Sequence, residues 1–230
     1  FMLVGIDLTL VIDEAIAEPT PPKTMRDAVI EPFRDFIGRA GLKSALLVLA
    51  FLFLYKLGDN MATALQTPFF IDVGFTLTQI GAIAKTAGLV AAITGGMIGG
   101  LIMVRLHINR ALWLFGVVQI ASILGFAVLS ELGANPWMLG VVVVFEYLGV
   151  GLGSAALIAF MAKTTNPAFA ATQLALFTAL VSVPRVFANA VTGVIVEHTG
   201  WTNFFLLCTA LAIPGMLLLL KVAPWNEERS

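Results

Sequence analysis

The chain has 230 residues, of which 59% are apolar and only 12% are charged, and its formal net charge is -1. A mean hydropathy of +0.97 lies outside the range of soluble domains and is typical of proteins whose helices cross a membrane. The net charge argues against a nucleic-acid partner, the single cysteine cannot form a disulfide within the chain, and the two histidines are isolated from each other and resemble no metal cluster. We therefore expect an all-α membrane protein that needs no metal and no cofactor.

The chain begins with an apolar run, 1–12, that is too short to cross a bilayer and lacks the basic start of a signal peptide. We interpret it as the tail of a preceding transmembrane helix, so that the chain is a fragment; an interfacial segment that opens a small protein is the alternative. Residues 13–43 are polar and Pro-rich, with helically spaced apolar residues from Met25 to Ile37. They predict a cytoplasmic linker with a short amphipathic helix, either a clasp under the membrane domain or a solvated connector.

Six apolar stretches follow, and each is long enough to cross the hydrocarbon core, which takes about 20 helical residues. They predict a six-helix membrane domain over 44–222 and a cytoplasmic tail over 223–230. The stretches are 44–70, 78–104, 111–132, 136–162, 169–196 and 201–222.

Basic residues are distributed unequally between the two sides of these stretches. Ten of the thirteen Lys and Arg residues lie in the segments on one side, whereas the loops 71–77, 133–135 and 197–200 on the other side have none. Because cytoplasmic loops collect positive charge, this pattern predicts that both ends of the chain are cytoplasmic.

Five charged residues lie well inside the stretches, where each charge costs roughly 2.5 to 3.5 kcal/mol to place in lipid. They are Lys56, Asp59, Lys85, Glu146 and Arg185. Polar residues accompany them at spacings of three or four, which puts them on one face of a helix. The amide-bearing ones are Asn60, Gln66 and Asn189. Such faces cannot point at lipid, so we expect them to line a cavity.

The order of these charges is informative when the stretches are taken as two groups of three. The first helix of each group carries an acid (Asp59, Glu146), the second a base (Lys85, Arg185), and the third no charge deep in the membrane. Two such groups run in opposite senses, as in the inverted repeats of secondary transporters, where the first two helices line the cavity and the third faces lipid. The charges therefore predict half of a transporter, built from two inverted three-helix repeats.

Several short motifs are specific when they are taken in order. They include Tyr-Lys-Leu-Gly-Asp-Asn-Met-Ala at 55–62, Lys-Thr-Ala-Gly at 85–88, Phe-Glu at 145–146, Ala-Thr-Gln at 171–173 and Glu-His-Thr-Gly-Trp at 197–201, together with residues 75–81. Across nearly the whole chain they resemble the C-terminal half of the AmpG-type muropeptide permeases of the major facilitator superfamily. One departure is the superfamily's Gly-x-x-x-Asp-Arg/Lys signature, which is reduced here to Gly100, Val104 and Arg105, so that a gating salt bridge at this loop is in doubt.

The resemblance implies a bacterial inner-membrane symporter that imports anhydro-muropeptides from the periplasm to the cytoplasm for peptidoglycan recycling, with an influence on beta-lactamase induction. It also implies an N-terminal six-helix half as the partner of this chain. The bilayer, the small-molecule substrate and protons would be the other partners.

Roles for the buried charges follow from this interpretation. We expect Glu146 to carry the coupled proton, with Asp59 as the alternative, because Lys56 lies three residues from Asp59 on the same helix face and favours its ionised form. Three bases against two acids leave a positive excess, which suits an anionic substrate. The predicted substrate contacts are Lys56, Lys85 and Arg185, with Asn60, Gln66 and Asn189 as neutral donors.

Other interpretations stay open at this point. Both acids can be structural ion-pair partners, and Tyr55 and Tyr147 can pack in the core rather than on sugar rings. The chain can belong to a transporter of another anionic solute, such as an acyl-coenzyme A, or to a non-transporting membrane partner or sensor. A membrane enzyme that uses Asp59 or Glu146 as acid or base is disfavoured, because the spans hold no His, Cys or metal constellation.

Overall fold

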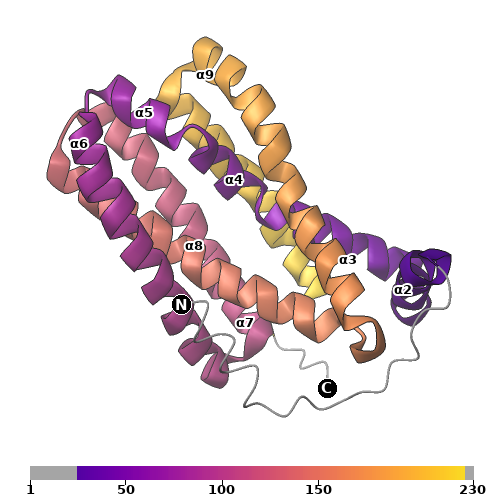
Figure 1. Cartoon of the computed structure of the whole chain (residues 1–230). Helices are drawn as coiled ribbons and strands as arrows, with labels where there is room; N and C mark the ends of the chain where they lie inside the picture. The colour runs from indigo at the N-terminus through magenta and orange to yellow at the C-terminus, as the bar shows by residue number, and fades with distance from the viewer. Residues whose placement is uncertain (1–24, 226–230) are drawn as a thin grey trace.

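The computed structural model of the chain describes residues 25–225, with side chains from residue 30 onward, and all its elements are helical. The predicted helix tail over 1–12, the start of the predicted linker and the last five residues lie outside this range. The elements, labelled in Figure 1, are α2 (Met25–Ala40), α3 (Leu42–Tyr55), α4 (Leu57–Ala64), α5 (Gln66–Val73), α6 (Leu77–Gln79), the π-helix η1 (Ile80–Ala87), α7 (Gly88–Leu132), α8 (Pro136–Thr164), the 3₁₀-helix η2 (Pro167–Phe169) and α9 (Ala170–Val222).

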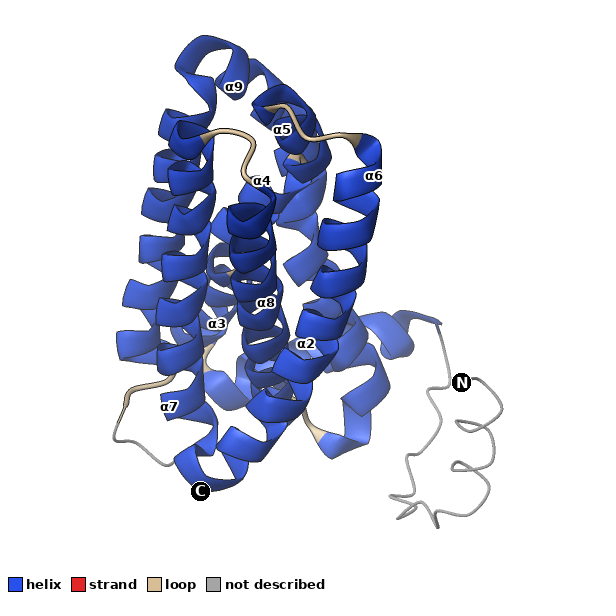
Figure 2. Cartoon of the chain, turned by 90° about the vertical axis from the view of Figure 1, so that its left-hand side faces the viewer, coloured by secondary structure: helices blue, strands red, loops and turns tan. Residues whose placement is uncertain are grey.

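Four helical stretches of the described chain are long and apolar enough to cross a membrane: Leu42–Ala64, Leu77–Leu132, Pro136–Thr164 and Pro167–Val222. They run close to parallel in Figure 2, and many of their apolar side chains face outward. On the first part of α7 the exposed apolar residues are Leu89, Val90, Ile93, Met97, Leu101 and Val104. An apolar exterior of this extent needs lipid around it, so the expectation of an all-α membrane protein is confirmed.

Two of these stretches, each 56 residues long, do not run straight. A straight helix of that length would measure about 84 Å, well over twice the thickness of a hydrocarbon core. In α7 the backbone leaves helical geometry at His107 (φ 61°), and in α9 it does so at Gly200 (φ 76°), a left-handed φ that glycine adopts without steric cost. Figure 1 shows α9 rising to the top of the molecule and returning beside itself. Each long stretch is therefore two helices that meet at one residue.

The predicted stretch 44–70 is interrupted twice, so that it forms α3, α4 and α5. The backbone departs from regular helix at Lys56 (φ -101°, ψ 0°) and at Leu65 (φ -109°, ψ 23°). Pro68 contributes to the second break, because a proline has no N–H to donate to the preceding turn. Farther along, Lys85 lies in η1, whose wider π-type turns are common near functional sites.

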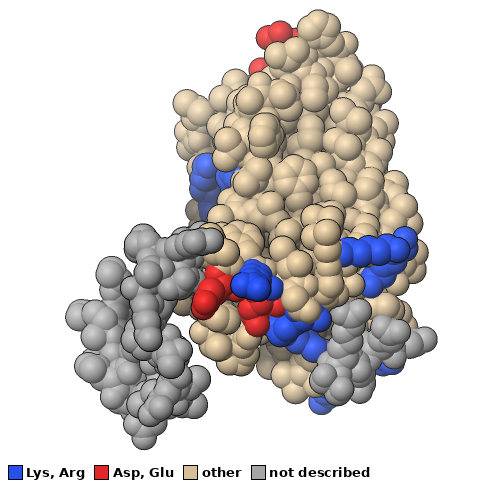
Figure 3. All heavy atoms as spheres, turned by 90° about the vertical axis from the view of Figure 1, so that its right-hand side faces the viewer, with Lys and Arg blue, Asp and Glu red and all other residues tan. Residues whose placement is uncertain are grey.

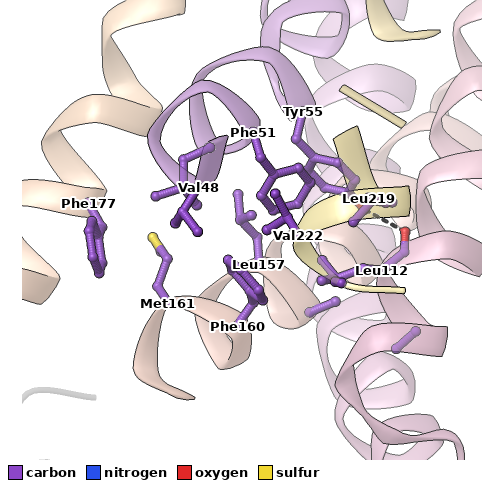
Figure 4. Packing of buried hydrophobic residues seen from close by; sticks show 14 of the residues in the cluster. Val48, Phe51, Tyr55, Leu112, Leu157, Phe160, Met161, Phe177, Leu219 and Val222 are labelled. Atoms are coloured by element: carbon purple, nitrogen blue, oxygen red, sulfur yellow. Dashed lines mark hydrogen bonds between the residues drawn. The ribbon is translucent and has the colours of Figure 1, made fainter. Parts of the chain in front are cut away.

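The interior consists of two apolar clusters with a polar layer between them. Figure 4 shows the first cluster, where Phe51 packs on Tyr55 and Phe160 with ring centroids 5.1 and 5.3 Å apart. The second is aromatic and includes Phe69, whose ring centroid lies 4.7 Å from that of Phe205. Along three helices the sequence passes from one cluster to the other through buried polar residues. These are Lys56 and Asp59, Gln119 and Ser122, and Glu146.

Glycines let α7 and α8 approach closely beside this layer. A Cβ on Gly151 would lie 2.3 Å from the carbonyl oxygen of Ala92, and one on Gly153 would lie 2.6 Å from the side chain of Gln119. Gly151 therefore allows backbone-to-backbone packing, and Gly153 leaves room for Gln119 in the polar layer.

The amphipathic helix α2 lies outside the bundle of long helices, beside the start of α3 (Figure 1). Its Phe36 is buried and packs edge-on against Phe177 of α9, with ring centroids 5.2 Å apart. Its polar side is tied to the start of α9 by Gln173, which is 2% exposed and donates from Nε2 to the Pro32 carbonyl at 2.8 Å. The same nitrogen donates to Asp35 Oδ2 at 3.1 Å.

Asp35 is the centre of this network. Asn166 Nδ2 donates to its Oδ1 at 3.0 Å, and Arg39 Nε lies 2.9 Å from its Oδ2. Partial burial raises the pKa of Asp35, but the hydrogen bonds from Asn166, Gln173 and Arg39 outweigh it, so that the net pKa is lowered from its ordinary value. The network therefore favours the ionised carboxylate and attaches α2 to the connection between α8 and α9.

Candidate functional site

A cavity of about 500 Å³ opens on the polar layer, lined by residues of α4, α5, η1, α8 and α9 and by Lys56 between α3 and α4. Its polar lining residues are Lys56, Asp59, Asn60, Thr63, Gln66, Thr67, Lys85, Tyr147, Ser154, Ser182 and Arg185. Six of the eight predicted site residues are among them; Glu146 and Asn189 are not. The helical stripes read from the sequence thus meet at one place, while the roles assigned to them stay predictions.

Lys56 and Asp59 form an ion pair within this layer. Lys56 Nζ lies 3.0 Å from Asp59 Oδ2, and the two side chains are only 7% and 9% exposed. The break between α3 and α4 at Lys56 puts Asp59 in the first turn of α4, where the partial positive charge of a helix N-terminus favours an acid. Removing either partner would leave an uncompensated buried charge, so the pair is held as a unit.

Glu146 lies behind the cavity on α8 and is 1% exposed. Its Oε2 accepts a hydrogen bond from the Ser122 hydroxyl, which also lies 2.8 Å from the carbonyl oxygen of Gln119. Ser122 and Gln119 belong to the second part of α7, the third helix of the first predicted repeat. Neither residue lines the cavity, so this helix contributes two buried polar side chains to the layer behind the cavity and none to its wall.

Ser122 and Gln119 are functional candidates that carry only a weak signal in the sequence. The two residues stand three apart in an apolar stretch, which places them on one helix face as in the stripes of the first and fifth stretches. Because neither residue is charged, the spacing alone does not distinguish them from packing residues. Their contact with Glu146, through the Ser122 hydroxyl, makes them significant.

Each of the two acids of the polar layer has one buried oxygen without a partner. Asp59 Oδ1 and Glu146 Oε1 are both buried and have no hydrogen-bond partner among the described residues. The layer thus holds two buried carboxyl groups, and Lys56 is paired with Asp59.

Gln66 and Tyr147 join α5 to α8 at the cavity wall. The Tyr147 hydroxyl donates to Gln66 Oε1 at 2.9 Å, and Gln66 Nε2 is buried without a partner in the described part of the chain. Tyr55, by contrast, is buried in the first apolar cluster and donates its hydroxyl to the Leu112 carbonyl at 3.0 Å (Figure 4). Tyr147 is therefore available to a ligand and Tyr55 is a core residue.

Lys85 and Arg185 face the cavity from η1 and α9, and both side chains are exposed. Neither forms an ion pair with an acid in the range 30–225. Two cations without counter-ions beside a cavity are suited to binding an anion, and a guanidinium can hold a carboxylate through two parallel hydrogen bonds.

Asn189 lies one turn beyond Arg185, is exposed, and is not among the lining residues. Residues four apart on a helix are displaced around its axis by about 40°, so a stripe with this spacing drifts away from the face where it began. The fifth stretch therefore presents Ser182 and Arg185 to the cavity, but not its whole polar stripe.

Comparison with known proteins identifies the family. Residues 1–189 match the model of the Major Facilitator Superfamily, which is well over half of the chain. The chain belongs to this superfamily.

Superfamily relatives cover most of this chain but only part of their own length. A protein of Haemophilus influenzae is 44% identical over 100% of this chain and 56% of the relative. The Anhydromuropeptide permease of Escherichia coli K12 is 44% identical over 88% of this chain and 42% of the relative, and the Putative transporter AmpG 1 of Rickettsia prowazekii is 34% identical over 77% and 40%. The chain spans about half the length of the curated relatives it matches.

These comparisons confirm the resemblance to AmpG-type permeases of the major facilitator superfamily. As a superfamily member with membrane-spanning helices, the chain is a multi-pass membrane protein. The loop that carries the reduced superfamily signature contains the break at His107, and the exposed Arg105 forms no ion pair within the described residues.

Within residues 25–225, no three His, Cys, Asp or Glu side chains are arranged to hold a metal ion. Cys208 is buried in the second apolar cluster.

Proposed function

We propose that this chain is one half of a proton-coupled transporter of the bacterial inner membrane, which imports anhydro-muropeptides from the periplasm for peptidoglycan recycling. The observation that carries the proposal is the cavity, where two cations without counter-ions in the described residues face a layer of buried acids. An anhydro-muropeptide carries sugar hydroxyls, amides and carboxylates, which suit Lys85, Arg185 and the amides of Asn60 and Gln66. The permease relative of Escherichia coli supports this choice of substrate class for the transporter.

Glu146 and Asp59 are the proton carriers in this proposal, and Lys56, Lys85 and Arg185 contribute positive charge to the substrate site. Only Asp59 of the two acids lines the cavity, while Glu146 is buried behind it. Protons would enter from the cavity, which lets substrate and proton share one pathway.

The fold we propose for this half is six membrane spans in two inverted three-helix repeats. The divisions of α7 at His107 and of α9 at Gly200 support a count of six, because each turns one long stretch into two. The alternating acid and base on the first two spans of each group support the repeat.

We infer that both ends of this half are cytoplasmic. On the face seen in Figure 3, charged side chains gather toward the lower end, with one basic group at mid-height and an acidic one at the top. Single cysteines, introduced after Cys208→Ala, test the orientation. Outside labelling of intact cells should reach positions 72 and 135 but not 107 or 165, and the reverse pattern would overturn it.

We further infer that a second six-helix half closes the cavity. The length of the relatives supports this, because the chain covers 42% of the Escherichia coli permease. Reconstituted alone, the chain should take up no muropeptide, whereas the protein with both halves should. Uptake by a chain shown to be monomeric would contradict this inference.

The proposed function is tested with the two-half protein in proteoliposomes. An inward proton gradient should drive accumulation of labelled anhydro-muropeptide, and collapse of the gradient should stop it. An excess of acetyl-coenzyme A should not compete. Uptake of acetyl-coenzyme A in place of muropeptide would show that the substrate assignment is wrong, and the absence of any uptake would reject the proposed function.

A further inference from the structure

A second cavity, of about 250 Å³, lies where α2 meets the ends of the long helices. Its lining residues come from α2, α3, α7, α8 and α9, and none of them lines the larger cavity described above. The second cavity is therefore a separate site in the molecule, and the proposed transport makes no use of it.

The floor of this cavity is apolar and belongs to the interior of the protein. Phe36, Val48, Phe160 and Val222 line it, are only 5 to 7% exposed, and are all members of the first apolar cluster. Four different helices supply them, namely α2, α3, α8 and α9. The floor is therefore fixed by the packing of the bundle.

Two basic side chains from different helices lie at the rim of the cavity. Arg39 is in the last turn of α2 and Lys163 in the last turn of α8, and both are exposed. Lys163 forms no ion pair with another described residue, whereas Arg39 Nε pairs with Asp35 Oδ2 at 2.9 Å. Among the described residues, no acid lines the cavity itself. Two cations and one paired acid leave one positive charge at the rim.

Polar groups complete the rim. Ser44 lies in the first turn of α3, and Gly41 before it has no side chain to cap the N–H groups of that turn. The Thr164 hydroxyl donates to the Phe160 carbonyl at 2.8 Å, so it is bonded within its own helix. The partial positive charge of the α3 start adds to the charge of the two basic side chains.

The cavity lies at the depth of the lipid headgroups. Ser44 begins the first apolar stretch, Lys163 directly follows the fourth, and Val222 ends the sixth. At the same end of the bundle, Trp113 donates its indole N–H to the Ala223 carbonyl at 3.1 Å. Tryptophans at the ends of membrane helices are typical of the boundary between lipid and water. The phosphate groups of the bilayer therefore lie at the level of this cavity.

We propose that this cavity binds the phosphate group of an anionic phospholipid. Lys163 and Arg39 are the charged contacts, and Ser44 is a hydroxyl donor. The one positive charge at the rim matches the single negative charge of a phosphodiester, and the apolar floor accommodates the carbon atoms next to it. Basic pockets between membrane helices on the cytoplasmic side bind lipid headgroups in this way.

The depth and the apolar floor favour a lipid over a soluble phosphate. With both ends of the chain cytoplasmic, as inferred above, the lipid belongs to the cytoplasmic leaflet. Bound there, it joins α2 to the end of α8 through Arg39 and Lys163, beside the network of Asp35. Occupation of the site should therefore raise the melting temperature of the protein.

The test is native mass spectrometry of the purified two-half protein, delipidated in a neutral detergent. It is titrated separately with phosphatidylglycerol, phosphatidylcholine and inorganic phosphate. The parent should bind phosphatidylglycerol more tightly than zwitterionic phosphatidylcholine. Lys163→Gln should weaken phosphatidylglycerol binding by about fivefold, the typical contribution of one basic residue near an anionic headgroup. Lys221→Gln is the matched control and should bind as the parent does, because Lys221 is an exposed lysine in the last turn of α9 that does not line the cavity.

A second variant separates lipid binding from folding. Ser44→Asp puts a negative charge in the first turn of α3, where an acid suits the helix dipole, but beside the proposed phosphate position. This variant should lose phosphatidylglycerol binding while keeping the melting temperature that the parent has without lipid. Lys163→Arg keeps the charge and should keep the binding.

Equal binding of the two lipids by the parent would overturn the proposal, as would parent-like binding in both Lys163→Gln and Ser44→Asp. An equal loss in Lys221→Gln would also overturn it, because the attraction would then come from diffuse surface charge. Binding of inorganic phosphate without phosphatidylglycerol would show a soluble anion in place of the lipid. None of these measurements needs muropeptide uptake, so the lipid site and the proposed function stand or fail separately.

Discussion

Two polar clusters in this chain differ in how completely their hydrogen bonds are made. In the network that holds α2, both oxygens of Asp35 are bonded, Gln173 Nε2 bonds Pro32 and Asp35, and Gln173 Oε1 accepts from the Asn166 backbone at 2.8 Å. In the polar layer of the bundle, four buried side-chain atoms are without a partner within the described residues. These are Asp59 Oδ1, Gln66 Nε2, Gln119 Nε2 and Glu146 Oε1.

The difference separates a structural role from a functional one. An unsatisfied buried polar group costs about 1 to 3 kcal/mol, so a fold keeps several together only where another requirement outweighs stability. The Gln173 network is complete without a ligand and holds two segments together. The layer around Glu146 is incomplete within the described residues, and we infer that a ligand pairs with its free donors and acceptors.

The largest expected effect that tests this contrast is at Glu146. Glu146→Gln keeps the shape and the hydrogen bond from Ser122 but cannot release a proton. Proton-driven uptake by the two-half protein should fall to the level seen without a gradient, while exchange of labelled substrate across the membrane should persist. Full proton-driven uptake by this variant would show that Glu146 has no coupling role, so that another acid carries the proton. The polar layer around Glu146 would then have no functional role that separates it from the α2 network.

The next effect is expected at the cavity cations. Arg185→Ala should weaken substrate binding by about 2 kcal/mol through loss of a charge-assisted hydrogen bond, whereas Arg105→Ala, whose exposed side chain lies outside the cavity lining, should not. Equilibrium binding to the purified protein measures both. Equal affinities of the two variants would exclude Arg185 from the substrate site.

A smaller effect is expected in the α2 network. Gln173→Ala leaves the Pro32 carbonyl without its bond from Gln173 Nε2 and removes one donor from Asp35, so we expect a loss of about 1 to 3 kcal/mol in unfolding free energy. Thermal unfolding in detergent measures it, with Thr178→Ala as the control, since the exposed Thr178 hydroxyl bonds only a carbonyl of its own helix. Proton-driven uptake of substrate should survive. An unchanged melting temperature would show that the complete network adds no stability.

The smallest effect is the pH dependence of the same network. Because the folded-state pKa of Asp35 is lowered below its ordinary value of 3.8, its ionised form stabilises the fold. This contribution is complete above the unfolded pKa, declines as the pH falls below about 3.8, and is lost once the pH passes below the folded pKa. The difference in melting temperature between the parent and Asp35→Asn should shrink over that range. A constant difference would contradict the assignment.

Much of the site was foreseeable from sequence. Apolar stretches, charges within them and helical spacing depend on local composition, because lipid excludes unpaired polar groups wherever they occur. That reasoning placed Lys56, Lys85 and Arg185 on faces that the fold does bring to one cavity. It also placed chain reversals at the loops that contain His107 and Gly200.

Tertiary structure alone decided which faces meet and at what depth. Ser122 meets Glu146 because of how α7 and α8 are rotated about their axes, which spacing within one helix does not specify. The same rotation leaves Asn189 outside the cavity, and the packing of α2 on α9 brings Asp35 to Gln173. The sequence by itself determined that this protein is a membrane bundle with charges at its centre; the packing of its helices decided which charges share one site.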